Sequence, residues 1–328
     1  MSDLSDRIAG LTPEKRALLL KRLKKNLVTD DINISRRDDI TSYPMSFAQQ
    51  RMWFLNQWET DSPFYNVTSI LQIKGDLDVE RLQRCLDEVI QRHEILRAYF
   101  RIENGKPVQQ IYPTLNLDYP FYDLSQLDQE QRKRQLQIIT SRDTQKGFNL
   151  NSGPLIRCTF VKVDVSLFVV ILTMHHIVTD GWSTGIINRE ISILYDSFSR
   201  GLATPLPEIP LQYSDYAAWE KNWLRKDIIQ DKIRYWKEIL ANPNVYLDLP
   251  SDFPRPKVQS FRGAHQKILV PDEIKRKLVD LSQNREVSFF MVLLSVYAIL
   301  LFRYSGQEDI RIGSPVANRN RTELETNI

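Results

Sequence analysis

Cysteine is the residue that this sequence most clearly lacks. The 328-residue chain contains two cysteines, which are too few for the disulfide framework of a small secreted protein. Cys85 falls within a helical pattern and Cys158 within a strand pattern, so we predict two buried thiols in a reducing cytoplasm. Residues 1–10 are mixed and charged without an apolar core, and this composition excludes a secretory signal.

No apolar run is long enough for a membrane-spanning helix. The most hydrophobic stretch, residues 289–302, falls short of the roughly 18 residues that are needed to cross a bilayer. Ser288 before it and Gly306 after it are residue types that favour the beginning and the end of a helix. We therefore expect a buried helix of a soluble lobe here, and no membrane partner.

An excess of charge of one sign is also missing. The 44 basic residues are nearly balanced by 41 acidic ones, for a net charge of +3, and the basic side chains form no stripe that would follow a phosphate backbone. We therefore expect no nucleic-acid partner. A hydrophobic content of 42% over this length is sufficient for a substantial core, and we expect two lobes.

What the sequence does contain is a concentration of reactive residue types between a strand and a helix. His175 and His176, two of only four histidines, lie close to Asp180 and Gly181. The nearly unbroken apolar run at residues 167–174 is typical of a strand that is buried on both faces. A helix with a C-terminal glycine is expected next, because apolar residues recur at spacings of four, three and four, at Ile187, Ile191, Leu194 and Phe198.

The adjacency of the two histidines predicts different roles for them. Neighbouring residues on a strand point to opposite faces, so only one of the pair can easily line a pocket. We expect His176, nearer the turn, to be catalytic and His175 to support it by packing or hydrogen bonding. A neutral imidazole with a pKa of about 6.5 is suited to removing or guiding a proton from an attacking amine or hydroxyl.

Asp180 and Gly181 each have more than one interpretation. Asp180 could hold a histidine tautomer or pair with a distant arginine, and we favour the second. Gly181 permits a tight turn, and its amide could donate a hydrogen bond to a developing oxyanion. A metal site is an alternative for the whole segment, but adjacent histidines chelate poorly and no cysteine or helical histidine spacing accompanies them. We predict no bound metal, and a purely structural histidine pair stays open.

The segment HHIVTDGWS at residues 175–183 resembles the HHxxxDG signature of the condensation domains of nonribosomal peptide synthetases. Four further segments resemble motifs of the same family in the same order. They are SxAQxRxWxL at residues 46–55, RHExLRTxF at 92–100 with Ala98 in place of threonine, YxDYAxW at 213–219, and IGxPxANR at 312–319. The resemblance extends from about residue 43 to the last residue.

Some of these segments also have an ordinary structural interpretation. Ser46 and Gln49 are spaced as a capping box, which predicts the start of a helix. A second amphipathic helix is predicted to end near His93, which we interpret as a helix-end residue and not as a catalyst. Residues 95–102 and 108–112 flank an Asn-Gly pair and predict a β-hairpin. The apolar positions of the second helix are Leu82, Cys85, Leu86, Val89 and Ile90.

The resemblance implies an α/β, two-lobed fold like that of chloramphenicol acetyltransferase, with the second lobe incomplete at the C-terminus of this chain. We assign residues 1–42 to an N-terminal helix and linker that could dock a partner, residues 43–200 to the N-terminal lobe with the HHxxxDG motif, and residues 201–328 to a partial C-terminal lobe. Thr12 and Pro13 mark the predicted start of the short basic N-terminal helix.

The same resemblance implies a reaction and its partners. Condensation domains join a carrier-bound acyl or peptidyl thioester to the amine of a carrier-bound aminoacyl thioester, with both substrates on 4'-phosphopantetheine arms. The expected partners are upstream and downstream peptidyl carrier domains, with an adenylation domain in the same or an adjacent polypeptide. No cofactor is expected on this chain itself. Because a thioester is already activated, no enzymic Ser or Cys nucleophile is required.

The resemblance also implies a salt bridge between Asp180 and an arginine of the RHExLRTxF segment. The candidates are Arg92 and Arg97, and we prefer Arg92. The other residues of the candidate site are His175, His176 and Gly181. Because the chain ends soon after the IGxPxANR segment, where family members continue, we expect a fragment of a larger synthetase. The alternatives are a catalytically inactive remnant that only docks carrier domains, and a free-standing acyltransferase of the same fold.

Overall fold

The computed structural model describes residues 34–37, 42–224, 226–242, 246–254, 257, 266–319 and 321–328. The chain divides into two compact units, Met1–Lys226 with Ala317–Ile328, and Asp227–Val316. The predicted basic helix that starts at Thr12 and most of the predicted linker after it lie outside the described residues.

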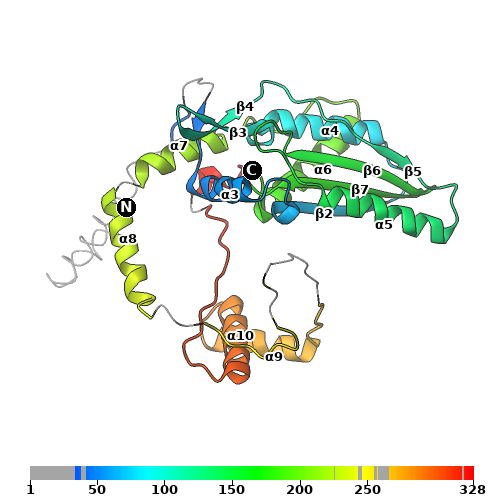
Figure 1. Ribbon diagram of the computed structural model, residues 1–328. Helices are drawn as coiled ribbons and strands as arrows, with labels where there is room; N and C mark the ends of the chain where they lie inside the picture. The colour runs from blue at the N-terminus through cyan, green and yellow to red at the C-terminus, as the bar shows by residue number, and fades with distance from the viewer. Residues whose placement is uncertain are drawn as a thin grey trace, which may run out of the picture. The chain divides into compact units, whose positions relative to one another are not determined.

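A four-stranded sheet forms the centre of the first unit (Figure 1). The predicted apolar strand is confirmed as β7, in which eight of nine residues are buried. It lies between two antiparallel neighbours, and its last residue, His175, is paired with Asn66. Only the outermost pair, β5 with β6, is parallel. The strands, in spatial order, are β2 (Asn66–Lys74), β7 (Leu167–His175), β6 (Ile156–Asp164) and β5 (Phe121–Asp123).

Helices cover both faces of this sheet. On one face lie α4 (Val79–Arg92) and α6 (Gly181–Ser199), which pack against each other, and on the other lies α5 (Gln129–Gln145) (Figure 1). The two helices predicted around the second and third motifs are thereby confirmed as α4 and α6. Gly201, with φ of 71°, follows the end of α6 in the left-handed conformation expected of a C-terminal glycine.

Alternate residues of β7 pack into two different apolar clusters. Val170 and Leu172 pack in the large core that α4 and α6 cover, whereas Val169 and Ile171 pack in the smaller cluster under α5. Because both faces of the strand are buried, it needs apolar side chains at nearly every position, which produces the continuous run in the sequence. The sheet therefore holds the end of β7, and with it the histidine pair, on a rigid support.

A smaller sheet with the order β1-β4-β3 contains the predicted hairpin. Its turn residues Asn104 and Gly105 have φ values of 49° and 73°, the left-handed backbone that a two-residue hairpin turn requires. The segment before the hairpin differs from the prediction, because Glu94–Arg97 form a short 3-10 helix, η2, in which the Leu96 amide bonds to the carbonyl of His93. The strands are β1 (Tyr43–Pro44), β4 (Lys106–Ile111) and β3 (Ala98–Glu103).

The predicted capping box at the start of α3 (Phe47–Trp58) is confirmed. The Gln49 amide donates to Ser46 Oγ at 3.2 Å, and the Ser46 amide donates to Gln49 Oε1 at 3.0 Å. The 3-10 helix η1 (Pro63–Tyr65) then leads into β2. These contacts fix the entry of the chain into the first unit.

The first unit includes more of the chain than the predicted N-terminal lobe. α7 (Tyr213–Trp223) packs against β1 and η2, and the C-terminal segment, with η3 (Thr322–Leu324), returns to the same unit. The predicted lobe boundary at residue 200 therefore does not coincide with the boundary between the compact units, at residue 226. The cause is the packing of α7, which the sequence pattern alone did not reveal.

The described part of the second unit consists of α8 (Lys226–Ile239), α9 (Asp272–Asn284) and α10 (Phe289–Ser305). Ser288 caps α10 and Gly306 ends it with φ of 70°, as predicted. The prediction that α10 is buried is wrong for the described residues, because only Val292 and Leu301 among its side chains are buried.

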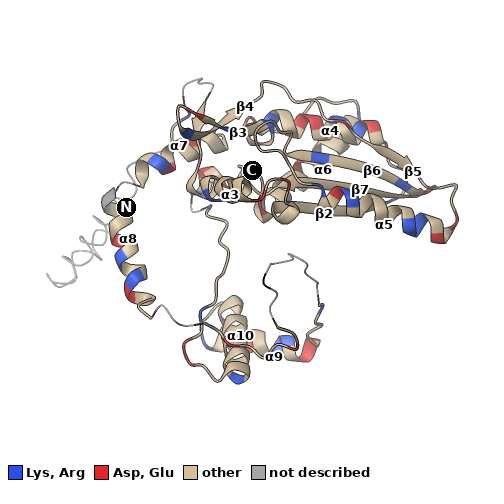
Figure 2. Ribbon diagram, viewed as in Figure 1, with Lys and Arg blue, Asp and Glu red and all other residues tan. Residues whose placement is uncertain are grey.

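Charged residues of both signs occur along α4, α5 and α8, whereas α10 has none over most of its length (Figure 2). Within the described residues, no single helix is sufficiently long and apolar to cross a membrane. The α9 and α10 helices pass that test only when taken together, as a pair bent by 112°.

Candidate functional site

The histidine pair lies where the chain leaves the central sheet. The backbone amide of His175 donates to the carbonyl of Leu155 at 3.0 Å, and that of His176 donates to the carbonyl of Tyr65 at 2.8 Å. The chain then turns, because the Val178 amide donates back to the carbonyl of His175. The loop is therefore anchored to the residue before β6 and to η1 before it reaches α6.

The His175 side chain is fully buried under the loop. Its Nδ1 accepts a hydrogen bond from the amide of Ile177 at 3.0 Å, and its ring lies 5.9 Å from that of Tyr65 and 6.2 Å from that of Phe148. Burial, and to a smaller extent the neighbouring His176, lower the pKa of His175 to about 4. A neutral ring whose Nδ1 accepts must carry its proton on Nε2. That Nε2 is buried without a hydrogen-bond partner among the described residues.

His176 has the opposite environment. Its side chain is exposed, and its Nδ1 lies 2.7 Å from the carbonyl oxygen of Thr179. Since a carbonyl can only accept, Nδ1 must be the protonated nitrogen and donate to it. The neutral ring then has its lone pair on Nε2, the nitrogen that is free to meet a substrate. The strand geometry thus buries one histidine and presents the other, as the alternation of side chains predicts.

Asp180 serves as the N-cap of α6. Its Oδ1 accepts hydrogen bonds from the amide and the hydroxyl of Ser183 at 2.8 and 2.6 Å, and its Oδ2 lies 3.0 Å from Nη1 of Arg319. Burial alone would raise the pKa of Asp180, but the Ser183 hydrogen bonds and the charge of Arg319 outweigh it, so the pKa lies below its ordinary value. Among the described residues, no hydrogen bond joins this carboxylate to either histidine.

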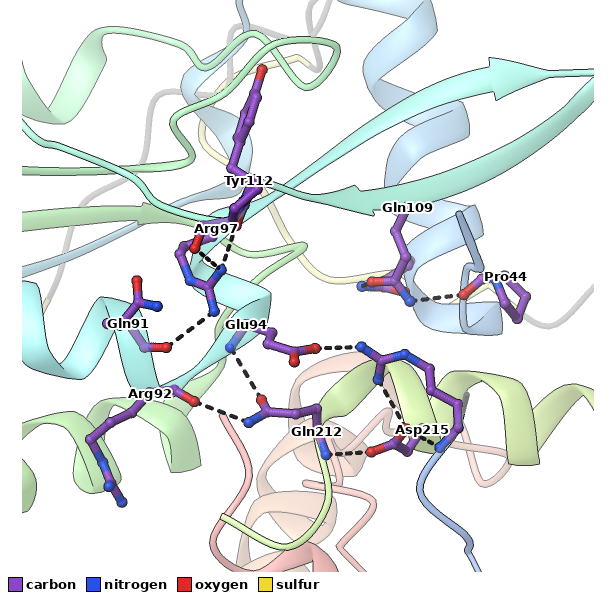
Figure 3. Close-up of polar contacts among 12 residues, drawn as sticks. Pro44, Gln91, Arg92, Glu94, Arg97, Gln109, Tyr112, Gln212 and Asp215 are labelled. Atoms are coloured by element: carbon purple, nitrogen blue, oxygen red, sulfur yellow. Dashed lines mark hydrogen bonds and ion pairs between the residues drawn. The ribbon is translucent and has the colours of Figure 1, made fainter. Parts of the chain in front are cut away.

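The predicted pairing of Asp180 with Arg92 or Arg97 is wrong. Arg92 donates to the carbonyl of Pro207 at 2.8 Å and lies 3.5 Å from Glu190. The guanidinium of Arg97 donates hydrogen bonds to backbone carbonyl oxygens at the end of α4 and after β4 (Figure 3). These are the carbonyls of Ile90, Gln91, Tyr112 and Pro113.

Arg319, the actual partner, is fixed by several acceptors at once. Besides Asp180, its guanidinium donates to the carbonyl of Ala317 at 2.9 Å, to Ser183 Oγ at 3.3 Å and to the carbonyl of Asn327 at 3.1 Å. A guanidinium has five N–H donors in a planar fork, so it can hold these groups together. The sequence placed Arg319 in the IGxPxANR segment but contained no spacing signal that connects it with a residue 139 positions away.

Side chains from two more of the recognised segments, SxAQxRxWxL and YxDYAxW, also form hydrogen bonds in this unit. The hydroxyls of Ser46 and Tyr213 are 2.9 Å apart, and the Asn318 amide donates to the hydroxyl of Tyr216 at 2.7 Å. That hydroxyl in turn donates to Glu220 at 2.9 Å. Both tyrosines of the YxDYAxW segment therefore have specific hydrogen bonds.

Gly181 is the first residue of α6, and its φ lies outside the left-handed region. The tight turn predicted for it is therefore not what requires a glycine. A Cβ added at this position would meet no atom within 4 Å, so the glycine leaves open space at the start of the helix. Its amide is one of the first N–H groups of the helix, which have no partner within the helix and carry its positive partial charge.

Neither cysteine is equipped to act as a nucleophile. Cys85 and Cys158 are buried free thiols, as predicted. Burial raises the pKa of Cys85 to about 11 and that of Cys158 further. The thiolate is the reactive form of cysteine, and it is suppressed at both positions. No group of three or more His, Cys, Asp or Glu side chains is arranged to hold a metal ion in the described part of the chain.

Comparison with protein families matches residues 39–328 to the condensation domain. The chain is 38% identical over 328 residues to a linear gramicidin synthase of Brevibacillus parabrevis, covering 100% of this chain and 4% of that protein. It is 38% identical over 327 residues to the phosphinothricin tripeptide synthetase PhsC of Streptomyces viridochromogenes, covering 99% of this chain and 30% of that protein. The chain thus spans less than a third of either relative.

Solved structures agree on the fold. A four-domain nonribosomal peptide synthetase bound to AMP and glycine superposes with a TM-score of 0.75 at 22% identity, covering 92% of this chain and 22% of that one. The X-domain from teicoplanin biosynthesis superposes with a TM-score of 0.77 at 24% identity, covering 90% of this chain and 65% of that one. These matches confirm the mixed α/β fold of the chloramphenicol acetyltransferase type.

Proposed function

Because this chain belongs to the condensation-domain family of nonribosomal peptide synthetases, we propose that it forms an amide bond between a carrier-bound acyl or peptidyl thioester and a carrier-bound aminoacyl thioester. One observation carries this proposal: the loop presents His176 to solvent with Nδ1 held by the Thr179 carbonyl, which leaves the Nε2 lone pair for the substrate amine. The buried neighbour, His175, fixes the loop from below.

In the proposed reaction, the amine nitrogen attacks the carbonyl carbon of the donor thioester. A C–N bond forms, the C–S bond breaks with its electron pair on sulfur, and the amine proton passes by way of His176 Nε2 to the departing thiolate. The thioester is already activated, so most of the rate enhancement comes from holding amine and carbonyl together. His176 then needs only to accept the proton or orient the amine.

The start of α6 completes the site. The Gly181 amide lies at the positive end of the helix beside open space, and it would donate to the oxygen that gains negative charge as the amine attacks. Asp180, engaged by Ser183 and Arg319, positions this helix start and does not handle the proton. The roles of His176 and Gly181 are chemical, and those of His175 and Asp180 are to hold the loop.

The substrates would arrive on the 4'-phosphopantetheine arms of upstream and downstream peptidyl carrier domains. An adenylation domain in the same or an adjacent polypeptide would load these carriers. The multidomain synthetases among the relatives, of which this chain spans only a small part, support this arrangement. We place the reaction in the cytoplasm, where unpaired buried thiols such as Cys85 and Cys158 persist.

The test is amide formation by His176→Ala with a panel of L-aminoacyl carrier proteins as donors and acceptors, detected as the mass of the dipeptidyl carrier. We expect product from the unmodified protein, loss of most of it in His176→Ala, and normal product in Arg189→Ala. Arg189 is a suitable control because it is an exposed residue of α6 with no role in the loop. Near-normal turnover by His176→Ala would overturn the role of this residue.

The same assay separates the alternatives. Carrier binding without product in the unmodified protein would identify an inactive docking domain. Equal rates with free and carrier-bound amines would identify a free-standing acyltransferase.

A further inference from the structure

Four described residues precede the family match, and two of them, Ile34 and Arg37, pack within the first unit. The match begins at residue 39, whereas the described segment at residues 34–37 lies before it. Ile34 is buried at 8% exposure in a small apolar cluster with Leu211, Tyr216 and Leu324. Two of these neighbours belong to α7 and to the C-terminal segment that carries Arg319. The segment therefore touches the elements that support the candidate site.

Arg37 makes the polar contacts of this segment. Its backbone amide and its Nη1 both donate to Oδ1 of Asp215, at 3.0 and 2.9 Å, and its Nη2 forms an ion pair with Glu94. The guanidinium also lies over the ring of Tyr43, 3.8 Å from its centre. One side chain thus joins α7, η2 and β1.

The ion pair with Asp215 differs from an ordinary surface salt bridge. The Asp215 side chain is 1% exposed and that of Arg37 is 14% exposed. A carboxylate that is removed from water requires a charge partner and hydrogen bonds, and loss of the partner is far more costly than loss of an exposed pair. Burial alone would lower the pKa of Arg37, but its hydrogen bonds and the two carboxylates raise it, so the guanidinium stays charged.

Asp215 and its neighbour Gln212 fasten the start of α7 to the RHExLRTxF segment. Asp215 Oδ2 accepts from the Gln212 amide at 2.7 Å, which closes the capping box of α7. The Gln212 side chain accepts from the Glu94 amide at 3.1 Å and donates to the carbonyl of Arg92 at 3.0 Å (Figure 3). Arg37 bridges the two carboxylates of this arrangement, so it fixes the position of α7 relative to η2.

From α7, the contacts continue to the candidate site. Tyr213 bonds to Ser46 at the cap of α3, and Tyr216 accepts from Asn318. Arg319, the next residue, holds Asp180. The path from Arg37 to the Asp180 carboxylate therefore consists of packed helices and hydrogen bonds within one compact unit.

We propose that Arg37, which lies outside the family match, is a positioning residue for the HHxxxDG loop. Its contacts with Asp215 and Glu94 fix the position of α7. In turn, α7 holds the Asn318–Arg319 segment where Arg319 can form its ion pair with Asp180. Ile34 anchors the segment so that Arg37 reaches both carboxylates. This inference rests on the proposed function, because the loop that it positions is the one to which we assign amide formation.

Arg36 provides a matched control for Arg37. It has the same charge and is adjacent in the sequence, but it is exposed. In the full polypeptide, we expect Arg37→Ala to slow single-turnover amide formation between L-aminoacyl carriers by about 2- to 30-fold, the range for changes within a coupled network. The KM for the carriers should change little, because the proposal assigns Arg37 to the position of the loop and not to carrier binding. Arg36→Ala should match the unmodified protein, and Arg37→Lys should recover part of the rate, because an ammonium can replace the charge but not the fork of contacts.

A double variant separates positioning from simple charge neutralisation. In Arg37→Gln/Asp215→Asn, the fully buried carboxylate is removed together with its partner, and only the partly exposed Glu94 loses a cation, so the midpoint of thermal unfolding should return toward that of the unmodified protein. If Arg37 positions the loop, the single-turnover rate stays low in this variant. Recovery of both the midpoint and the rate would overturn the proposal, as would an unchanged rate per folded molecule in Arg37→Ala.

A readout that needs no activity distinguishes failure of this proposal from failure of the proposed function. With isotope-labelled histidine, the Nδ1–H resonance of His176, assigned with His176→Gln, reports the hydrogen bond to the Thr179 carbonyl. We expect this resonance to shift or broaden in Arg37→Ala and to be unchanged in Arg36→Ala. If the unmodified protein forms no amide bond, the proposed function fails, and the resonance still tests the positioning. An unchanged resonance in Arg37→Ala overturns the positioning role, whatever the activity.

Discussion

Arg319 Nη1 lies 3.0 Å from Asp180 Oδ2, although 139 positions separate the two residues in the sequence. The contact joins the start of α6 to the segment that returns from the second unit to the first. It also explains why Asp180 is not available to the histidines, since Ser183 occupies its other oxygen. Asp180 and Arg319 are therefore a supporting pair for the loop.

We predict that Arg319→Ala destabilises the first unit and reduces amide formation. Asp180 is half-buried, so leaving it without its cation should lower the free energy of unfolding by about 1–3 kcal/mol. A double-mutant cycle of Arg319→Ala with Asp180→Asn, followed by urea unfolding at pH 7, should give a coupling energy of about 0.5–3 kcal/mol. Additive effects of the two substitutions would contradict a direct interaction between them.

His175 makes the stability of the protein depend on pH. Its pKa is lowered from 6.5 to about 4 in the folded state, so between these values the unfolded chain binds a proton that the folded chain does not. The free energy of unfolding should therefore be constant above pH 6.5 as far as this residue is concerned, and fall by about 3 kcal/mol as the pH decreases toward 4. The measurement is urea unfolding at a series of pH values in this interval.

His175→Asn provides the comparison for that series. The Asn side-chain oxygen can accept from the Ile177 amide in place of Nδ1 but does not titrate. The variant should lose the part of the pH dependence that lies between pH 4 and 6.5. An unchanged pH dependence in this variant would assign the effect to other groups.

The sequence predicted local features well and distant contacts poorly. The apolar run of β7, the capping box at Ser46 and the Asn-Gly hairpin each depend on residues within a few positions, and each was confirmed. The pairing of Asp180 was assigned to the wrong arginine, because the resemblance implied a partner within the RHExLRTxF segment, which contains Arg92 and Arg97. Arg97 is not available to Asp180, because its guanidinium donates to backbone carbonyl oxygens. That arrangement depends on the 3-10 helix η2, where the sequence predicted a strand.

The sequence pattern also did not predict that α7 packs in the first unit and supports the candidate site. We predicted a lobe boundary at residue 200, and the chain does form an irregular, proline-containing connection at residues 202–209. The chain nevertheless stays in the first unit up to residue 226, because Gln212 and Asp215 bond to the end of α4 and to Arg37. Such contacts depend on the tertiary arrangement, and a composition shift cannot report them.

Ile171 tests the double-sided burial of β7. It is fully buried, and its cross-strand partner on β2, Ile70, is 50% exposed. Ile171→Ala should lower the free energy of unfolding by about 2–5 kcal/mol, because it removes contacts in the cluster under α5 and leaves a cavity. Ile70→Ala, the same chemical change on the neighbouring strand, should cost about 1 kcal/mol or less. Equal losses in urea unfolding would show that β7 is not packed more tightly than the edge strand.

Gly181 offers a substitution that separates folding from activity. Its backbone is not left-handed and a Cβ would meet no neighbouring atom, so Gly181→Ala should fold with an unchanged or higher unfolding midpoint. Gly185, one turn further along α6, shares both properties and is a matched control. Its replacement by Ala should stabilise the helix by about 0.5–1 kcal/mol without affecting the reaction.

The two glycine variants should differ in the rate of amide formation. The methyl group of Gly181→Ala would occupy the open space at the start of α6 in which the thioester carbonyl is proposed to lie. A displacement of the reacting atoms by about 1 Å can cost on the order of 100-fold in rate, so we expect a single-turnover rate that is about 10- to 100-fold lower, whereas Gly185→Ala keeps the normal rate. If Gly181→Ala also keeps it, the carbonyl does not lie at the start of α6, and the oxyanion role of this amide is wrong.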